Sequence, residues 1–271
     1  MSNHIQITIT DIQPEQQDVL IAHLSEAGFE GFEQNDLELK AFIAENSYDK
    51  KLLDEMAFKY QLSFNEQVIP GQNWNALWES NFQPVIVDDF VAIRADFHEP
   101  IKNVEYEIVI TPKMSFGTGH HATTYMMVQQ MRNIDLNNKT VFDFGTGTGV
   151  LAILAEKSGA KEVIAVDNDD WSISNAEENI QNNNCSRIKL KKADSAEMTG
   201  HFDIILANIN KNVIVENFPS LVSHLNGKGT LLLSGLLEDD EADILAEACK
   251  YPLVLNAKTS DRGWISLRFN H

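Results

Sequence analysis

The chain has 271 residues, of which 43% are hydrophobic, so it is long enough to bury one large core or two modest ones. Apolar residues recur along the whole chain, which excludes disorder. The formal charge of −19 argues against direct binding of a nucleic acid, because the 21 Lys and Arg residues form no basic cluster. This acidity either keeps the protein soluble or attracts a cationic partner such as a lysine-rich protein, and composition does not decide between the two.

The expected location is the cytoplasm. The two cysteines, Cys185 and Cys249, show no pairing motif, which is typical of a reduced compartment. Residues 1–4 lack the basic stretch and apolar core of a signal peptide. No apolar run approaches the length of a membrane span, and the longest, at residues 229–234, predicts one buried strand.

The first 69 residues predict a small α+β domain. Ile5, Ile7 and Ile9 alternate within residues 4–9, as in a half-buried strand. The following elements are a helix from Pro14 to Gly28, strands near 29–33 and 37–43, a helix near 48–58 with Leu52, Leu53 and Met56 inward, and a strand near 62–69. This β-α-β-β-α-β order is the ferredoxin-like pattern, so residues 1–69 are predicted to form such a domain, suited to substrate recognition.

Residues 70–84 are irregular and rich in aromatic side chains, with Trp74 and Trp78 among them. A packed linker explains them better than a ligand-binding box. Strands near 85–87, 90–93 and 104–110 follow, and they open the second predicted domain, residues 85–271.

From about residue 122 strands and helices alternate, as in a doubly wound parallel sheet. The predicted strands are 140–144, 163–167, 188–191, 202–207, 230–233, 253–257 and 263–269, and the predicted helices are 124–132, 150–157, 171–182, one after Asn212 that Pro219 interrupts or kinks, and 241–248. The last two strands are too close in sequence for a crossover helix, so they should pair antiparallel. A seven-stranded sheet with this ending is typical of methyltransferases and unusual among dinucleotide-binding domains.

The sequence from Val141 to Gly149 carries the main cofactor motif. An apolar strand containing Asp143 runs into Gly145, Gly147 and Gly149, and a helix starts at once. These glycines let the backbone turn tightly and approach a ligand at the carboxyl end of the strand. The G-x-G-x-G spacing differs from the dinucleotide and phosphate-loop motifs. The Asp143 carboxylate would repel a pyrophosphate and favour a cationic amino acid moiety, such as the methionine end of S-adenosylmethionine.

The next strand ends in Asp167, 22 residues after Gly145. A carboxylate there can accept hydrogen bonds from both ribose hydroxyls, with Asn168 beside it, or it can cap the next helix, for which Asp169 is better placed. Asp194, after the third strand, either faces the adenine amino group or belongs to a turn. Together these features predict an S-adenosylmethionine site.

Asn208 ends the strand of residues 203–207 and would lie over the reacting methyl group. The Asn-Pro-Pro-aromatic motif that is usual in enzymes methylating amides is absent at residues 208–210, which favours an amine as the acceptor. We therefore expect Asn208 to orient the amine as a catalytic residue.

Residues 116–124, FGTGHHATT, resemble one family in particular. They are similar to the FGTGTHPTT motif of the bacterial enzymes that methylate large-subunit ribosomal protein eleven, with His120 and Ala122 replacing Thr and Pro. Ala122 in place of proline predicts a less rigid loop. Further matches lie at residues 73–78, 82–84, 207–209 and, more weakly, 263–265, so the resemblance spans nearly the whole chain.

The resemblance implies an S-adenosylmethionine-dependent protein methyltransferase whose cofactor-binding positions include Thr124, Gly145, Asp167 and Asn208. It implies that the N-terminal domain grips the ribosomal protein and swings on its linker. The implied products are methylated lysine side chains and a methylated N-terminal amine. We expect a monomer with no metal.

The role of two adjacent histidines remains open. His120 and His121 point in different directions, so at most one could accept a proton; a loop that closes over the cofactor explains them better.

Other functions also remain open. The acceptor could be another protein or a small-molecule amine. An inactive cofactor-binding module or a nicotinamide-dependent oxidoreductase fits the motifs less well.

Overall fold

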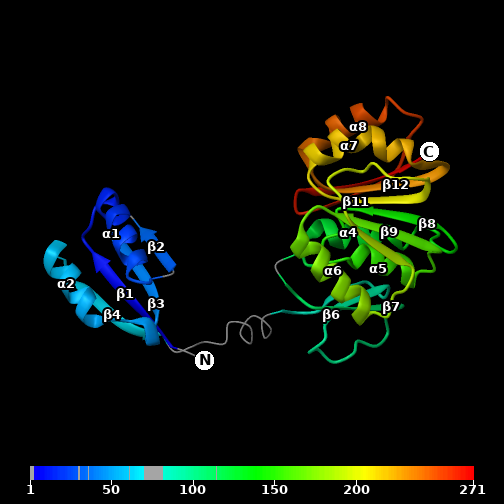
Figure 1. Ribbon diagram of the computed structural model, residues 1–271. Helices are drawn as coiled ribbons and strands as arrows, with labels where there is room; N and C mark the ends of the chain where they lie inside the picture. Colours follow the sequence, from blue (N-terminus) through cyan, green and yellow to red (C-terminus); the bar gives the residue numbers. More distant parts are fainter. Residues whose placement is uncertain (1–2, 30, 36, 61, 70–81, 114) are drawn as a thin grey trace. The chain divides into compact units, whose positions relative to one another are not determined.

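The computed structural model describes residues 3–29, 31–35, 37–60, 62–69, 82–113 and 115–271. The chain divides into two compact units, residues 1–81 and 82–271 (Figure 1). Residues 70–81 of the predicted linker, with Trp74 and Trp78, lie outside the described residues. Within the part that is described, no helix combines the length and apolar character needed to cross a membrane.

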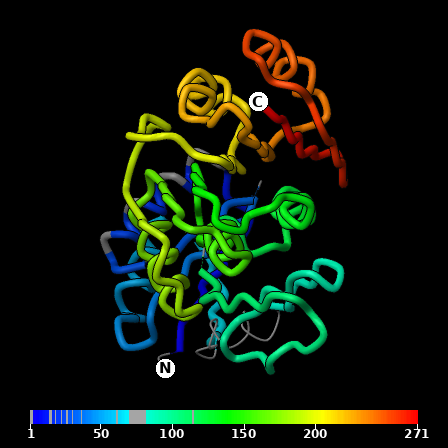
Figure 2. The backbone as a smooth tube through the Cα atoms, turned by 90° about the vertical axis from the view of Figure 1, so that its right-hand side faces the viewer, coloured from blue at the N-terminus to red at the C-terminus, as the bar shows by residue number. Residues whose placement is uncertain are grey.

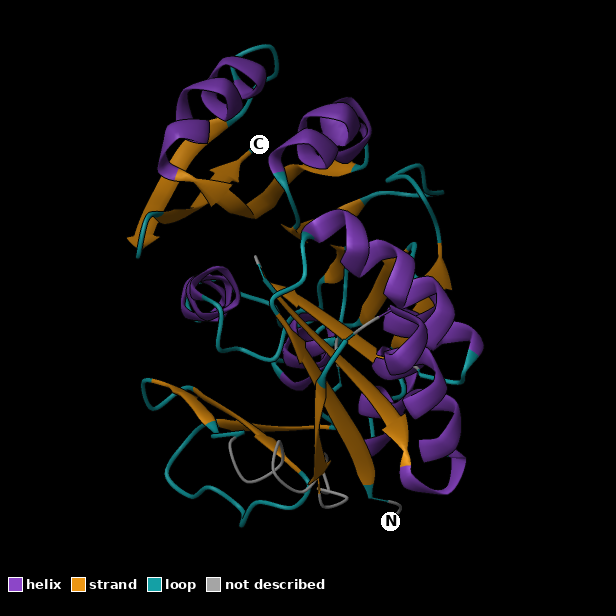
Figure 3. Cartoon of the chain, turned by 90° about the vertical axis from the view of Figure 1, so that its left-hand side faces the viewer, coloured by secondary structure: helices purple, strands orange, loops and turns teal. Residues whose placement is uncertain are grey.

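The N-terminal unit is a four-stranded antiparallel sheet in the order β2-β3-β1-β4. Its elements are β1 (His4–Thr10), α1 (Pro14–Glu26), β2 (Gly31–Asn35), β3 (Glu38–Ala44), a short 3₁₀ helix (Glu45–Ser47), α2 (Lys50–Tyr60) and β4 (Phe64–Ile69). One core cluster joins the inward residues of β1 and β3 to Leu24 of α1 and Leu53 of α2, so both helices cover the same face of the sheet (Figure 3). This is the predicted ferredoxin-like arrangement.

The register of α2 differs from the prediction in one respect. Leu53 is buried, whereas Leu52 is 40% exposed, so the inward position predicted for Leu52 is wrong. The helix begins at Lys50 rather than near residue 48, because Asp49 accepts hydrogen bonds from the backbone N–H groups of residues 51 and 52. The inward stripe therefore falls on Leu53, Met56 and Tyr60.

The C-terminal unit is built on a seven-stranded sheet in the order β10-β9-β8-β11-β12-β14-β13. Its strands are β8 (Thr140–Phe144), β9 (Glu162–Asp167), β10 (Ile188–Lys192), β11 (Phe202–Asn208), β12 (Leu225–Leu237), β13 (Val254–Asp261) and β14 (Trp264–Asn270). The first five in this order are parallel, and β14 runs antiparallel to both of its neighbours. The doubly wound sheet with an antiparallel final hairpin is confirmed.

Helices cover both faces of this sheet. They are α4 (Ala122–Met131), α5 (Val150–Lys157), α6 (Asp170–Asn182), α7 (Lys211–Ser223) and α8 (Glu241–Ala248), with a 3₁₀ turn at Glu238–Asp240. The first three pack with one core and the last two with the other. Figure 2 shows α7 and α8, yellow to orange, on the side of the final strands opposite α4, green. Pro219 lies inside α7 without ending it, because buried Phe218 and Leu221 hold both halves of the helix on the sheet.

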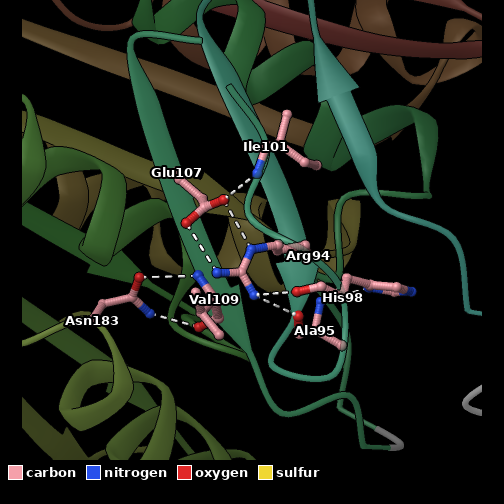
Figure 4. A network of polar contacts seen from close by, with 7 residues as sticks. All are labelled: Arg94, Ala95, His98, Ile101, Glu107, Val109 and Asn183. Atoms are coloured by element: carbon pink, nitrogen blue, oxygen red, sulfur yellow. Dashed lines mark hydrogen bonds and ion pairs between the residues drawn. The ribbon is translucent and has the colours of Figure 1, made fainter. Parts of the chain in front are cut away.

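A separate three-stranded sheet, β5 (Val85–Val87), β6 (Val91–Ala95) and β7 (Tyr106–Ile110), packs against the core formed with α4 and α5. A buried Arg94 holds β6 to β7 through two hydrogen bonds to Glu107, and it also donates to the carbonyls of Ala95 and His98 (Figure 4). The Arg94 guanidinium lowers the pKa of Glu107. This sheet fixes the position of the end of β7, from which residues 111–121 lead to α4.

Candidate functional site

A cavity of about 460 Å³ lies at the carboxyl ends of β8, β9 and β11, where the direction of winding reverses. Six of the predicted cofactor-binding residues line it: Gly145, Gly147, Asp167, Asn168, Asp194 and Asn208. Thr124 and Asp143 are not among the lining residues; Thr124 accepts a hydrogen bond from the lining residue Asn208, and Asp143 accepts one from Thr146, which lies between the lining residues Gly145 and Gly147. These six residues therefore converge on one cavity from the ends of four strands, β8, β9, β10 and β11.

The glycine turn at residues 145–149 forms the floor of the cavity. Gly145 and Gly147 have positive φ angles of 77° and 54°. A Cβ at Gly145 would lie 2.2 Å from Cγ2 of Ile209, and one at Gly147 would lie 2.3 Å from the carbonyl oxygen of Phe116. Both positions thus require glycine for conformation and for space.

We expect Gly147→Ala to weaken cofactor binding and to lower the melting temperature. The added methyl would displace the backbone of Phe116, because a carbonyl fixed by a hydrogen bond from Thr148 cannot rotate away as a flexible side chain can. Overpacking of this kind costs about 1–3 kcal/mol. Gly200→Ala is the matched control, since Gly200 has a φ of 98° but nothing within 4 Å of its added methyl. Both variants strain a backbone with positive φ, and only Gly147→Ala also creates a steric clash, so titration calorimetry and thermal melts of the two variants separate these causes. Equal losses of affinity and melting temperature in the two variants would contradict the packing argument.

Asp167 is held at the end of β9 by two backbone groups. Its Oδ2 accepts from the N–H of Gly147 at 2.8 Å, and its Oδ1 accepts from the N–H of Asp169 at 3.1 Å. Asp169 caps α6 by accepting from Ser172, so the helix-cap role belongs to Asp169. The Asp167 carboxylate is therefore fixed in orientation and faces the cavity beside Asn168, with lone pairs left for a ligand.

Asp143 is completely buried under the glycine turn. Its Oδ2 accepts a hydrogen bond from the Thr146 hydroxyl at 2.6 Å, while its Oδ1 has no hydrogen-bond partner. Burial raises the pKa of Asp143 to about 7; the hydrogen bond from Thr146 opposes this rise, and the nearby Asp167 carboxylate adds to it. Asp143 as a cofactor-binding residue stays a prediction, and the hydrogen bond from Thr146 links its carboxyl group to the glycine turn.

This burial makes a pH-dependent contribution to stability. The contribution is fully present below the unfolded pKa of 3.8 and is lost as pH rises through about 7, because the folded protein holds the proton more tightly. We expect the free energy of unfolding of wild type to fall about 2–3 kcal/mol more between pH 5 and pH 7 than that of Asp143→Asn. Urea unfolding of both proteins at several pH values measures this difference. Parallel pH profiles would show that Asp143 does not titrate in this range.

Asn208 lies at the tip of β11 and is 93% buried, since only 7% of its surface is exposed. Its Nδ2 donates to the Thr124 hydroxyl at 3.1 Å, whereas its Oδ1 is buried without a partner. An unsatisfied buried acceptor is rare in folded proteins and often marks a position that a ligand completes. The first turn of α4 thus holds the Asn208 amide, and its oxygen accepts no hydrogen bond from the described residues.

Three aromatic rings form a wall of the cavity that was not among the predicted site residues. His121 lies with its ring centroid 5.2 Å from that of Phe116 and 4.8 Å from that of Trp264. Phe116 and His121 belong to the FGTGHHATT motif, and Trp264 begins β14. Only the motif gave a sequence signal for this wall. His120 is turned elsewhere and contacts the Gln83 carbonyl at 2.8 Å, so the two histidines do point apart.

The described residues contain no group of three or more His, Cys, Asp or Glu side chains able to hold a metal ion. The arrangement instead offers a glycine floor, a fixed carboxylate and a free amide oxygen beside an aromatic wall. These groups can bind a nucleoside, orient a nitrogen and pack against a cation.

Comparison with known proteins gives a consistent result. A family model described as "Ribosomal protein L11 methyltransferase (PrmA)" matches residues 3–271. A ribosomal protein L11 methyltransferase of Porphyromonas gingivalis is 38% identical, with 93% of this chain and 90% of the relative covered. One of Chlorobaculum tepidum is also 38% identical, with 88% and 86% covered. The crystal structure of a ribosomal protein L11 methylase from Lactobacillus delbrueckii subsp. bulgaricus superposes with a TM-score of 0.65 at 31% identity, covering 69% of this chain and 98% of that one.

Proposed function

This chain belongs to the ribosomal protein L11 methyltransferase family and is an S-adenosylmethionine-dependent methyltransferase, and we propose that it methylates lysine side chains and the N-terminal amine of that large-subunit ribosomal protein. The observation that carries the proposal is the Oδ1 of Asn208, a buried acceptor without a partner among the described residues, on a residue that lines the same cavity as Phe116, His121 and Trp264.

The residues around the cavity fit the cofactor. We assign the ribose to Asp167 and Asn168, the adenine amino group to Asp194, and the methionine end to the turn at Gly145 and Gly147. The bound sulfonium supplies an activated methyl group, so the protein has only to bind it, exclude water and align the acceptor nitrogen. Thr124 takes part by holding the Asn208 amide.

The acceptor amine has to arrive without its proton. A lysine in water has a pKa of about 10.4, and burial in an apolar slot lowers it by disfavouring the charged form. The wall of Phe116, His121 and Trp264 provides that slot, and Asn208 Oδ1 accepts a hydrogen bond from the remaining N–H. Aromatic faces also attract the methylated ammonium product. No residue other than Asn208 is assigned to the reacting nitrogen.

The N-terminal unit is proposed to grip the ribosomal protein. A small-molecule amine would need no second unit of this size, and a chain of net charge −19 attracts a basic protein rather than a nucleic acid. We propose that the enzyme acts as a monomer in the cytoplasm, where its two free cysteines stay reduced.

The proposal is tested by incubating the purified chain with isotope-labelled S-adenosylmethionine and separated ribosomal proteins, followed by mass spectrometry of the labelled products. The expected result is label on lysine and N-terminal amines of L11. Label on a different protein, or label on small-molecule amines at the same rate as on L11, would contradict the proposal and identify that protein or amine as the substrate. Removal of residues 1–81 should abolish labelling of the ribosomal protein without abolishing cofactor binding.

A further inference from the structure

Helix α6 holds the chain segment that leaves β7. Thr111, the first residue after β7, donates its backbone N–H to Asn179 Oδ1 at 2.7 Å, and its carbonyl accepts from Asn175 Nδ2 at 3.0 Å. Its hydroxyl donates to Glu178 at 2.9 Å. Side chains of α6 thus replace the strand that the outer edge of β7 lacks in its three-stranded sheet.

Asn179 makes a second contact that its neighbours do not. Its Nδ2 donates to the carbonyl of Thr148 at 2.8 Å, inside the glycine turn. The side chain is fully buried, and both ends of its amide are used, one on the segment after β7 and one on the turn. Asn179 therefore bridges the segment after β7 and the glycine turn, which forms the floor of the cavity.

Thr148 in turn forms hydrogen bonds with the Phe116–Gly119 loop, the start of the FGTGHHATT motif. Its backbone N–H donates to the carbonyl of Phe116 at 3.0 Å, and its hydroxyl donates to the carbonyl of Gly117 at 2.8 Å. Phe116 lines the cavity, and its carbonyl is the group that leaves no room for a side chain at Gly147. Displacement of Thr148 would move both the glycine floor and the aromatic wall.

We infer that Asn179 is a positioning residue for cofactor binding: it touches no ligand and holds the Phe116–Gly119 loop in register with the glycine turn. The inference rests on the proposed cofactor site. Loss of the bridge leaves the buried Thr148 carbonyl and the partly buried Thr111 N–H without the Asn179 amide, and the loop and turn relax independently. We therefore expect the loss of Asn179 to lower the affinity for the cofactor more than it lowers kcat.

Asn183 offers a matched control one turn further along the helix. Its Oδ1 accepts from the Val109 N–H at 3.0 Å and its Nδ2 donates to the Val109 carbonyl at 2.6 Å, so it clamps the same strand without reaching the glycine turn (Figure 4). Asn179→Ala and Asn183→Ala each remove an amide that bonds β7 or the segment leaving it, and only the first removes the link to Thr148.

The experiment measures the Kd for S-adenosylhomocysteine by titration calorimetry, the KM for S-adenosylmethionine and kcat, and the melting temperature of wild type and both variants. Asn179→Ala should raise Kd and KM about tenfold with a smaller change in kcat, while Asn183→Ala lowers the melting temperature and leaves Kd within about twofold. An unchanged Kd in Asn179→Ala, or an equal rise in both variants, overturns the inference.

A second variant covers the case in which Asn179→Ala does not fold. Thr148→Val keeps the side-chain shape and removes only the hydroxyl bond to Gly117, so it should raise the Kd for S-adenosylhomocysteine in the same direction. An unchanged Kd in Thr148→Val then overturns the inference. Failure of the wild type itself to bind S-adenosylhomocysteine would instead overturn the proposed cofactor site.

Discussion

Replacing Asn208 by alanine is expected to lower kcat about 100-fold while the melting temperature changes little, since misplacement of reacting groups by about 1 Å has a cost of this size. The amide is held by the Thr124 hydroxyl on α4, and its free Oδ1 faces no protein donor. Alanine therefore removes the acceptor for the substrate N–H and costs the folded protein only one hydrogen bond. Single-turnover methylation with saturating cofactor measures the effect on the chemical step.

Two further variants separate orientation from general damage. Thr124→Val removes the hydroxyl that fixes the amide and should lower kcat by a smaller factor, about tenfold, because Asn208 remains but can rotate. Asn217→Ala also deletes a buried amide, which bonds the Ala196 N–H and the Val213 carbonyl and does not itself line the cavity, so it should lower stability more than kcat. Native turnover in Asn208→Ala would remove this residue from the mechanism.

Asp167→Asn should raise the Kd for S-adenosylhomocysteine about 100-fold. Hydrogen bonds to a charged acceptor contribute about 1.5–3 kcal/mol each, and two ribose hydroxyls would lose that acceptor. An amide also turns one N–H group toward the backbone donors of Gly147 or Asp169, so the side chain loses its fixed orientation. Titration calorimetry at 25 °C gives the Kd directly.

The control for this variant is Asp169→Asn, two residues away. Asp169 caps α6 and is not among the lining residues, and asparagine is an equally good cap, so both affinity and melting temperature should stay close to wild type. Equal losses of affinity in the two variants would mean that negative charge near α6 matters and that the specific carboxylate at β9 does not.

The sequence was sufficient to predict those parts of the site that depend on a short stretch of neighbouring residues. The glycine turn and Asp167 are set by strand ends and a short motif, and the structure places them on one cavity. The aromatic wall could not be predicted, because Trp264 reaches His121 only through the pairing of β14 with β12. That contact joins residues more than a hundred positions apart, and it produces no motif or hydrophobic periodicity in the sequence.

Asp143 illustrates a different limit. Its neighbours Phe142 and Phe144 both belong to the core beneath α7 and α8, while Val141 belongs to the core beneath α4 and α5. Alternation along β8 therefore directs Asp143 to the α4–α5 side, away from open solvent. The motif revealed that a carboxyl group is present, but its burial and raised pKa depend on the helices packed over that face of the sheet.

The sheet order has a consequence for synthesis of the protein. Strand β14 is made after β13 yet lies between β12 and β13, so the growing chain has to leave the place beside β12 empty until β14 emerges. Trp264, at the start of β14, completes the aromatic wall. A nascent chain that already carries the glycine turn and Asn208 therefore still lacks Trp264, and the aromatic wall is complete only once the last strand has been made.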